Sequence, residues 1–119
     1  MITRDFAHHF AAEWIAAWNG HDLQHVLSHY TDDFEMSTPF IVTLMNEPSG
    51  TLKGKDKVSA YWGAALRKYT DLRFELIDIL YGVDTVVIYY RSILGKKSAE
   101  FFWFDSSGKV WKAIAHYDQ

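Results

Sequence analysis

The sequence predicts an α+β fold in which helices cover one face of a curved antiparallel sheet, and three observations support this. Apolar side chains recur every four residues near the start of the chain, and the period changes to two around residues 34–38. Four segments rich in β-branched and aromatic residues then fill the second half. Helices first and strands afterwards are typical of α+β layering. With 119 residues, the chain fits one domain, 1–119, around one core.

The first helix is predicted from an aromatic stripe. Phe10, Trp14 and Trp18 recur at intervals of four, which places them on one face of a helix that runs to about Trp18. Asn19-Gly20 is expected to end this helix in a left-handed conformation. Asp22 can then cap a second, short helix. The apolar side of this second helix consists of Leu23, Val26, Leu27 and Tyr30.

A strand is predicted next, because apolar and polar side chains alternate. Phe34, Met36 and Thr38 point to one side of it. Pro39 is expected to end regular pairing. The stretch 40–53 has no clear period, which predicts a loop with room for one short strand.

A third helix is predicted to begin at Gly54-Lys55-Asp56, and everything after it is expected to be strand. Its apolar stripe consists of Val58, Trp62, Ala65, Leu66 and Tyr69. The strands are predicted at 72–81, 85–93, 97–104 and 109–117. Because the segments between them are rich in Gly, Asp and Ser, the strands are expected to form successive hairpins of a meander.

Composition and charge argue against several classes of function. The absence of cysteine rules out disulfides, a thiolate nucleophile and Cys-ligated zinc. A net charge of −3 with dispersed Lys and Arg offers no basic stripe for nucleic acid. Without an apolar leader or a membrane-length stretch, we expect a cytoplasmic protein with no membrane partner. The aromatic content of 17% favours a ring-lined cavity, although an aromatic core would explain it too.

Several motifs in order resemble the nuclear transport factor 2-like superfamily, and most closely its SnoaL-like polyketide cyclase and ketosteroid isomerase group. They are Trp14-Ile-Ala-Ala-Trp-Asn-Gly-His-Asp-Leu23, Tyr30-Thr-Asp-Asp-Phe-Glu35, Gly54-Lys-Asp56 and Phe104-Asp-Ser-Ser-Gly-Lys-Val110. The resemblance spans essentially the whole chain and implies a cone-shaped fold with a cystatin-like roll. It implies less about function, since this fold hosts isomerases, cyclases, dehydratases, epoxide hydrolases and non-catalytic binders.

The isomerases of this group imply specific roles for three positions. Their general base is an Asp directly before a Pro, and here Thr38 precedes Pro39, so the base is missing. Their oxyanion hole pairs a Tyr with an Asp that an apolar site keeps protonated in ketosteroid isomerase. These two positions correspond to Trp14, which still offers an N–H donor, and Glu100, whose carboxyl is one methylene longer.

Glu100 is the strongest candidate for chemistry. Its carboxyl interrupts an otherwise apolar strand, 98–104, and if it faces the helices with Phe102, burial should raise its pKa. Such a group can act as an acid or base near neutral pH. The alternative is an outward Glu100 paired with Lys97 or Lys112.

Two function classes follow from these candidates. The first is a cofactor-independent isomerase, cyclase or dehydratase that acts by proton transfer on a small hydrophobic carbonyl compound, with Glu100 and Trp14 as catalytic residues. The expected walls of its cavity are Phe10, Trp18, Tyr30, Phe34, Met36, Thr38, Trp62, Phe102, Ala115 and Tyr117. The second is a non-catalytic ligand-binding or scaffold module, in which Trp14 is core packing. Arg91 could orient a carboxylate, but its strand allows it to face either way.

His21, His25 and His29 recur at intervals of four, a spacing that suits a metal site. They lie opposite the apolar side of the second helix, so they are expected to face water, and no metal site is predicted.

The outer face of the sheet is expected to carry Phe101, Trp103, Ile114 and His116 beside Lys112. An exposed apolar patch of this kind predicts a homodimer through this face. An acid pairing of His116 with Asp118 is the other interpretation of that histidine.

Overall fold

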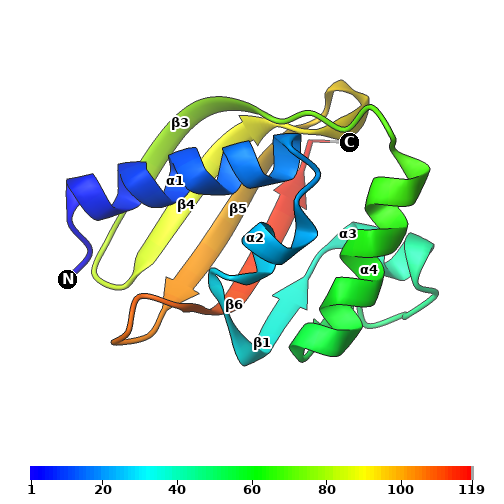
Figure 1. Cartoon of the computed structure of the whole chain (residues 1–119), viewed down its shortest axis with the longest axis horizontal. Helices are drawn as coiled ribbons and strands as arrows, with labels where there is room; N and C mark the ends of the chain where they lie inside the picture. The colour runs from blue at the N-terminus through cyan, green and yellow to red at the C-terminus, as the bar shows by residue number, and fades with distance from the viewer. Residues whose placement is uncertain (119) are drawn as a thin grey trace.

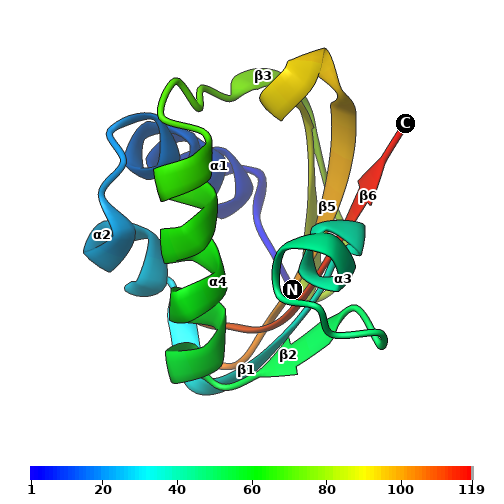
Figure 2. The ribbon, with the colours of Figure 1, turned by 90° about the vertical axis from the view of Figure 1, so that its right-hand side faces the viewer.

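The computed structural model describes residues 1–118 and has the predicted α+β layering (Figure 1). Its elements are α1 (Arg4–Asn19), α2 (Leu23–Leu27), β1 (Tyr30–Ser37), α3 (Pro39–Leu44), β2 (Thr51–Lys53), α4 (Lys55–Lys68), β3 (Glu75–Tyr81), β4 (Thr85–Arg91), the 3-10 turn η1 (Ile93–Gly95), β5 (Lys97–Phe104) and β6 (Val110–Tyr117). The strands form one sheet in the order β2-β1-β6-β5-β4-β3. Figure 2 shows α1, α2 and α4 together on one side of this curved sheet.

The predicted meander is confirmed, since each strand from β3 to β6 pairs antiparallel with the next. β1 instead pairs parallel with β6, with Met36 opposite Ala113. The parallel pairing joins the two halves of the chain in one sheet. None of the helices in the described part of the chain is both long and apolar enough to cross a bilayer.

The junction between the first two helices differs from the prediction. Asp22 caps α2 as expected, because its carboxylate accepts a hydrogen bond from the backbone N–H of His25 at 3.1 Å. The left-handed residue, however, is His21 at φ 53°, whereas Gly20 has an ordinary φ of −81°. His21 is held there because its Nε2 lies 2.9 Å from the carbonyl oxygen of Leu72, in the segment before β3.

The stretch 40–53, predicted as a loop with room for one short strand, contains such a strand, β2, but also most of the helix α3, which was not predicted. Pro39 ends β1 as predicted, but it also begins α3, where its fixed φ fits the first turn and its missing N–H costs nothing. Thr38 caps this helix by accepting a hydrogen bond from the backbone N–H of Phe40 at 3.3 Å. The lack of periodicity therefore gave no sign of this short helix, and Thr38-Pro39 is the sequence feature that marks its start.

Candidate functional site

A cavity lies between the helices and the sheet, and its lining comes from α1, α3, α4 and the strands β1, β4, β5 and β6. The lining residues are Trp14, Trp18, Met36, Phe40, Leu44, Tyr61, Trp62, Ala65, Tyr69, Leu72, Phe74, Tyr90, Ser92, Ile93, Glu100 and Tyr117. The centre of a water molecule can occupy a volume of about 40 Å³ inside the cavity. Since one water needs roughly 10–15 Å³ by this measure, the cavity holds a few waters or a ligand of similar size.

Glu100 is the acidic residue among this lining, and it faces the helices, which is the inward one of the two orientations that the sequence left open. Only 3% of its surface is exposed. Burial raises the pKa of its carboxyl to about 7, and a hydrogen bond from the Tyr90 hydroxyl to Oε1, at 2.9 Å, partly offsets this effect. The carboxyl therefore exchanges its proton near neutral pH.

Three largely buried tyrosines line the cavity together with this carboxyl. Burial raises the pKa of Tyr117 to about 12 and also raises the pKa values of Tyr61 and Tyr90. A hydrogen bond with Thr38 lowers the pKa values of Tyr61 and Tyr117 and partly offsets burial. These phenols stay protonated at neutral pH, so they supply hydrogen-bond donors but no base.

The indole of Trp14 does not have the partner expected for it. Its Nε1 donates to the hydroxyl of Tyr30 at 3.0 Å rather than to Glu100, while its ring stacks on Phe74 at 5.5 Å. The indole N–H of Trp18, in contrast, is buried without a hydrogen-bond partner among the described residues. Trp18 lines the cavity, so the unpaired donor in this region belongs to Trp18 and not to Trp14.

Six of the predicted site residues line the cavity: Trp14, Trp18, Met36, Trp62, Glu100 and Tyr117. The other six are buried nearby but do not line it: Phe10, Tyr30, Phe34, Thr38, Phe102 and Ala115. Phe10 packs edge-to-face on Phe102 at 5.0 Å, and Tyr30 lies 4.4 Å from Phe34 between ring centroids. These rings fill the core instead of bordering a space, a distinction that periodicity cannot make.

The sequence prediction missed Tyr90, the hydroxyl partner of Glu100. Val86, Ile88 and Tyr90 alternate on the buried face of β4, and this pattern could have identified it. Arg91 follows Tyr90 and is exposed, with its guanidinium donating to the carbonyl of Gly95 at 3.0 Å. It faces away from the cavity, so the interpretation in which it orients a ligand carboxylate is wrong.

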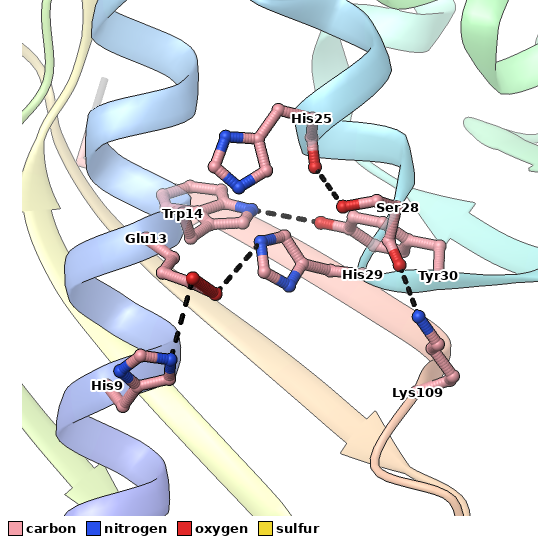
Figure 3. A network of polar contacts seen from close by, with 8 residues as sticks. All are labelled: His9, Glu13, Trp14, His25, Ser28, His29, Tyr30 and Lys109. Carbon is pink, nitrogen blue, oxygen red and sulfur yellow. Dashed lines mark hydrogen bonds and ion pairs between the residues drawn. The ribbon is translucent and has the colours of Figure 1, made fainter.

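A second polar cluster lies on the other side of α1, where His25 and His29 approach Glu13 (Figure 3). His25 is exposed, as predicted, but His29 is not, since only 15% of its side chain is accessible. The edge of its ring packs against Phe10, with the centroids 5.3 Å apart. The turn after α2 directs this imidazole toward α1, which the helical wheel of the second helix did not anticipate.

The outer face of the sheet carries the predicted apolar patch. Phe101 is 37% exposed, and Trp103 and Ile114 are half-buried. The Lys112 ammonium lies 5.4 Å from the ring centroid of Trp103, and the ring of His116 lies 5.1 Å from that of Phe101. The five side chains therefore share one surface.

Comparisons with known proteins agree with this architecture. No curated protein sequence matches the chain significantly. A crystal structure of a SnoaL-like protein of unknown function from Burkholderia thailandensis E264 is 53% identical, with a TM-score of 0.96 over 99% of this chain and 98% of that one.

Two more distant structures share the fold alone. Bal32a, from a soil-derived mobile gene cassette, is 17% identical, with a TM-score of 0.81 over 97% of this chain and 91% of that one. An isomerase candidate of the SnoaL-like family from Agrobacterium tumefaciens str. C58 is 15% identical, with a TM-score of 0.76 over 97% of this chain and 99% of that one. The family model of the SnoaL-like domain matches residues 11–113, and the chain therefore belongs to this family.

Proposed function

We propose that the protein is a cofactor-independent enzyme that moves a proton on a small hydrophobic carbonyl compound, with Glu100 as the acid and base. One observation carries the proposal: a single carboxyl, 3% exposed and with a pKa of about 7, lies among the aromatic walls of the cavity. A group with this pKa takes up and releases protons at similar cost near neutral pH. The distant isomerase candidate with the same fold is consistent with this chemistry.

The charged form of Glu100 would take a proton from the carbon next to the substrate carbonyl. The electron pair of that C–H bond forms a new carbon–carbon double bond, and the π pair of the carbonyl moves onto its oxygen, which gives an enolate. The free N–H of Trp18 offers this oxygen a hydrogen bond. Returning the proton to another carbon gives isomerisation, and giving it to a departing hydroxyl gives dehydration. Tyr90 holds the carboxyl in place through its hydrogen bond.

The test is turnover of a panel of small enones and cyclic ketones by the wild type and by Glu100→Gln, which keeps the shape of the side chain. We expect the variant to lose at least about a hundredfold in kcat/KM. The wild-type rate should rise with pH through a single ionisation near pH 7, because the charged carboxyl takes the proton and its pKa is about 7. Glu75→Gln, an exposed change on β3, is the matched control. Equal turnover by wild type and Glu100→Gln would overturn the assignment.

The second candidate is a binding module without chemistry. One observation favours it: Thr38, which caps α3, stands where the related isomerases have their base. Native mass spectrometry of protein incubated with metabolite extracts separates the two proposals. A ligand recovered unchanged from the wild type and from Glu100→Gln alike supports the module, whereas a ligand altered by the wild type alone supports the enzyme.

We also propose that two copies associate through the outer face of the sheet. The support is the exposure of Phe101 and the partial exposure of Trp103 and Ile114 on one strand pair, because a lone apolar patch on a small domain favours self-association. Sedimentation at micromolar concentration should give a dimer for the wild type and a monomer for Trp103→Glu. A wild-type monomer, or a variant that remains dimeric, would contradict this.

A further inference from the structure

The corner between α1 and the turn that follows α2 contains a group of metal-binding side chains that the cavity does not use. Glu13, His25 and His29 each direct a possible ligand atom into this corner, and these three atoms lie within 4.8 Å of one another. Figure 3 shows the imidazole of His29 pointing at the Glu13 carboxylate, with the ring of His25 beside it. Two helices and the turn before β1 thus bring three donors together.

The imidazole of His29 has a buried nitrogen, Nε2, that lacks a hydrogen-bond partner among the described residues. The nearest carboxylate oxygen, Oε1 of Glu13, is 3.9 Å away from it. A buried ring nitrogen normally has a partner, so the distance to Glu13 leaves a place for a bridging atom.

The neighbouring contacts hold the other donors in position. The ring of His25 stacks on that of His29, with centroids 5.6 Å apart. His9, one turn before Glu13 on α1, places its Nε2 3.5 Å from the other oxygen of Glu13. The carbonyl of Ser28 accepts a hydrogen bond from the Lys109 ammonium at 2.6 Å, which ties the turn carrying His29 to the connection before β6.

We propose that Glu13, His25 and His29 bind one divalent transition-metal ion of the zinc class. Two imidazoles and one carboxylate are a common protein ligand set for Zn²⁺, which completes its coordination with water. Two atoms bound to one zinc at about 2.1 Å each lie at most about 4.2 Å apart, so the three donors need only a small closing movement. Glu13 and His25 can supply it, since the Glu13 side chain is 39% exposed and His25 lies at the surface.

The ion would join α1 to the turn between α2 and β1. Glu13 precedes Trp14 and His29 precedes Tyr30, and the side chains of Trp14 and Tyr30 are already hydrogen-bonded to each other. Metal binding would therefore fasten the same two backbone segments a second time.

The test is calorimetric titration of tag-free, EDTA-treated and dialysed protein with ZnCl₂, together with the visible absorption of the Co²⁺-loaded protein. We expect one ion per chain, and Co²⁺ bands of the intensity given by four- or five-coordinate sites. Glu13→Gln and His29→Gln should each weaken Zn²⁺ binding at least about tenfold. His8→Gln, at an exposed histidine of α1 outside the corner, should leave it unchanged.

Circular dichroism establishes whether each variant is folded. If His29→Gln does not fold, His25→Gln, which changes a more exposed ligand, repeats the test. Failure of the wild type to bind one ion would overturn the proposal. So would equal weakening by His8→Gln and by the ligand variants, because scattered surface histidines would then explain the binding. Neither result bears on Glu100, so the two proposals are tested independently.

Discussion

Glu13 on α1 and Glu100 on β5 are two carboxylates whose surroundings give them different chemistry. Glu13 has a side chain 39% exposed and two histidines within reach, so water and imidazoles stabilise its charge. Glu100 is 3% exposed among aromatic rings, with a phenol as its hydrogen-bond partner, so its charge is costly. The same functional group is therefore suited to hold a cation at one site and to exchange a proton at the other.

The largest effect expected from this difference is on stability against pH. The carboxyl of Glu100 has a pKa raised from 4.5 to about 7 in the folded protein. Below pH 4.5 it is protonated in both states. As the pH rises from 4.5 through 7, the unfolded state loses the proton first, so the folded state loses stability. At about 1.4 kcal/mol per pKa unit, this loss is about 3 kcal/mol.

Glu100→Gln should remove this dependence. Denaturant unfolding of the wild type and the variant at pH 5 and pH 8 measures it, and the variant should gain about 3 kcal/mol relative to the wild type between those pH values. Glu75→Gln controls for the loss of an exposed charge. A constant difference between wild type and Glu100→Gln would mean that the carboxyl is not buried as described.

A smaller effect is expected at Trp14, which lines the cavity of Glu100 and directly follows Glu13 in the chain. Trp14→Phe removes the N–H that reaches Tyr30 at 3.0 Å and leaves a buried hydroxyl without its donor. We expect a loss of about 1–3 kcal/mol in the free energy of unfolding, beyond a small packing cost. Adding Tyr30→Phe should recover part of it, since both partners are then apolar. A double variant as unstable as the sum of the two single variants would contradict the bond.

The smallest effect is expected at Glu13. In metal-free buffer, Glu13→Gln should change the free energy of unfolding by no more than about 0.5 kcal/mol, because a partly exposed ion pair with histidine contributes little. Thermal unfolding measured with EDTA present tests this. A loss above about 1 kcal/mol would show that Glu13, like Glu100, has a structural role that does not depend on a cation.

The sequence predicts the layers better than the sites, for a physical reason. Alternation groups the residues that share one face of a strand, and it puts Glu100 on the same face of β5 as Phe102, which the structure shows to be the inner face. It does not determine where packing leaves a gap, so it predicts cavity walls at Phe10 and Phe34, neither of which lines the cavity. The hydrogen-bond partner of Trp14 also depends on a contact sixteen residues away, which no local pattern encodes.

Short elements marked by caps are harder to predict than long periodic ones. α3 has six residues and no visible stripe, and Pro39 by itself indicates only the end of a strand. A helical wheel places His29 on the water side, yet this residue lies beyond the last residue of α2, where the wheel no longer applies. A boundary error of two residues is therefore enough to hide the candidate metal site.

The parallel pairing of β1 with β6 also has a consequence for how the protein is made. β1 spans Tyr30–Ser37 and gains its main partner only when Val110–Tyr117 is available, which leaves it beside the three-residue β2 until then. Such distant pairing slows folding, since a long loop must close before the contact forms. The cavity wall that includes Met36 cannot assemble during synthesis of the first half. An interrupted chain would expose Phe34 and Met36, which are buried in the complete fold, to chaperones and proteases.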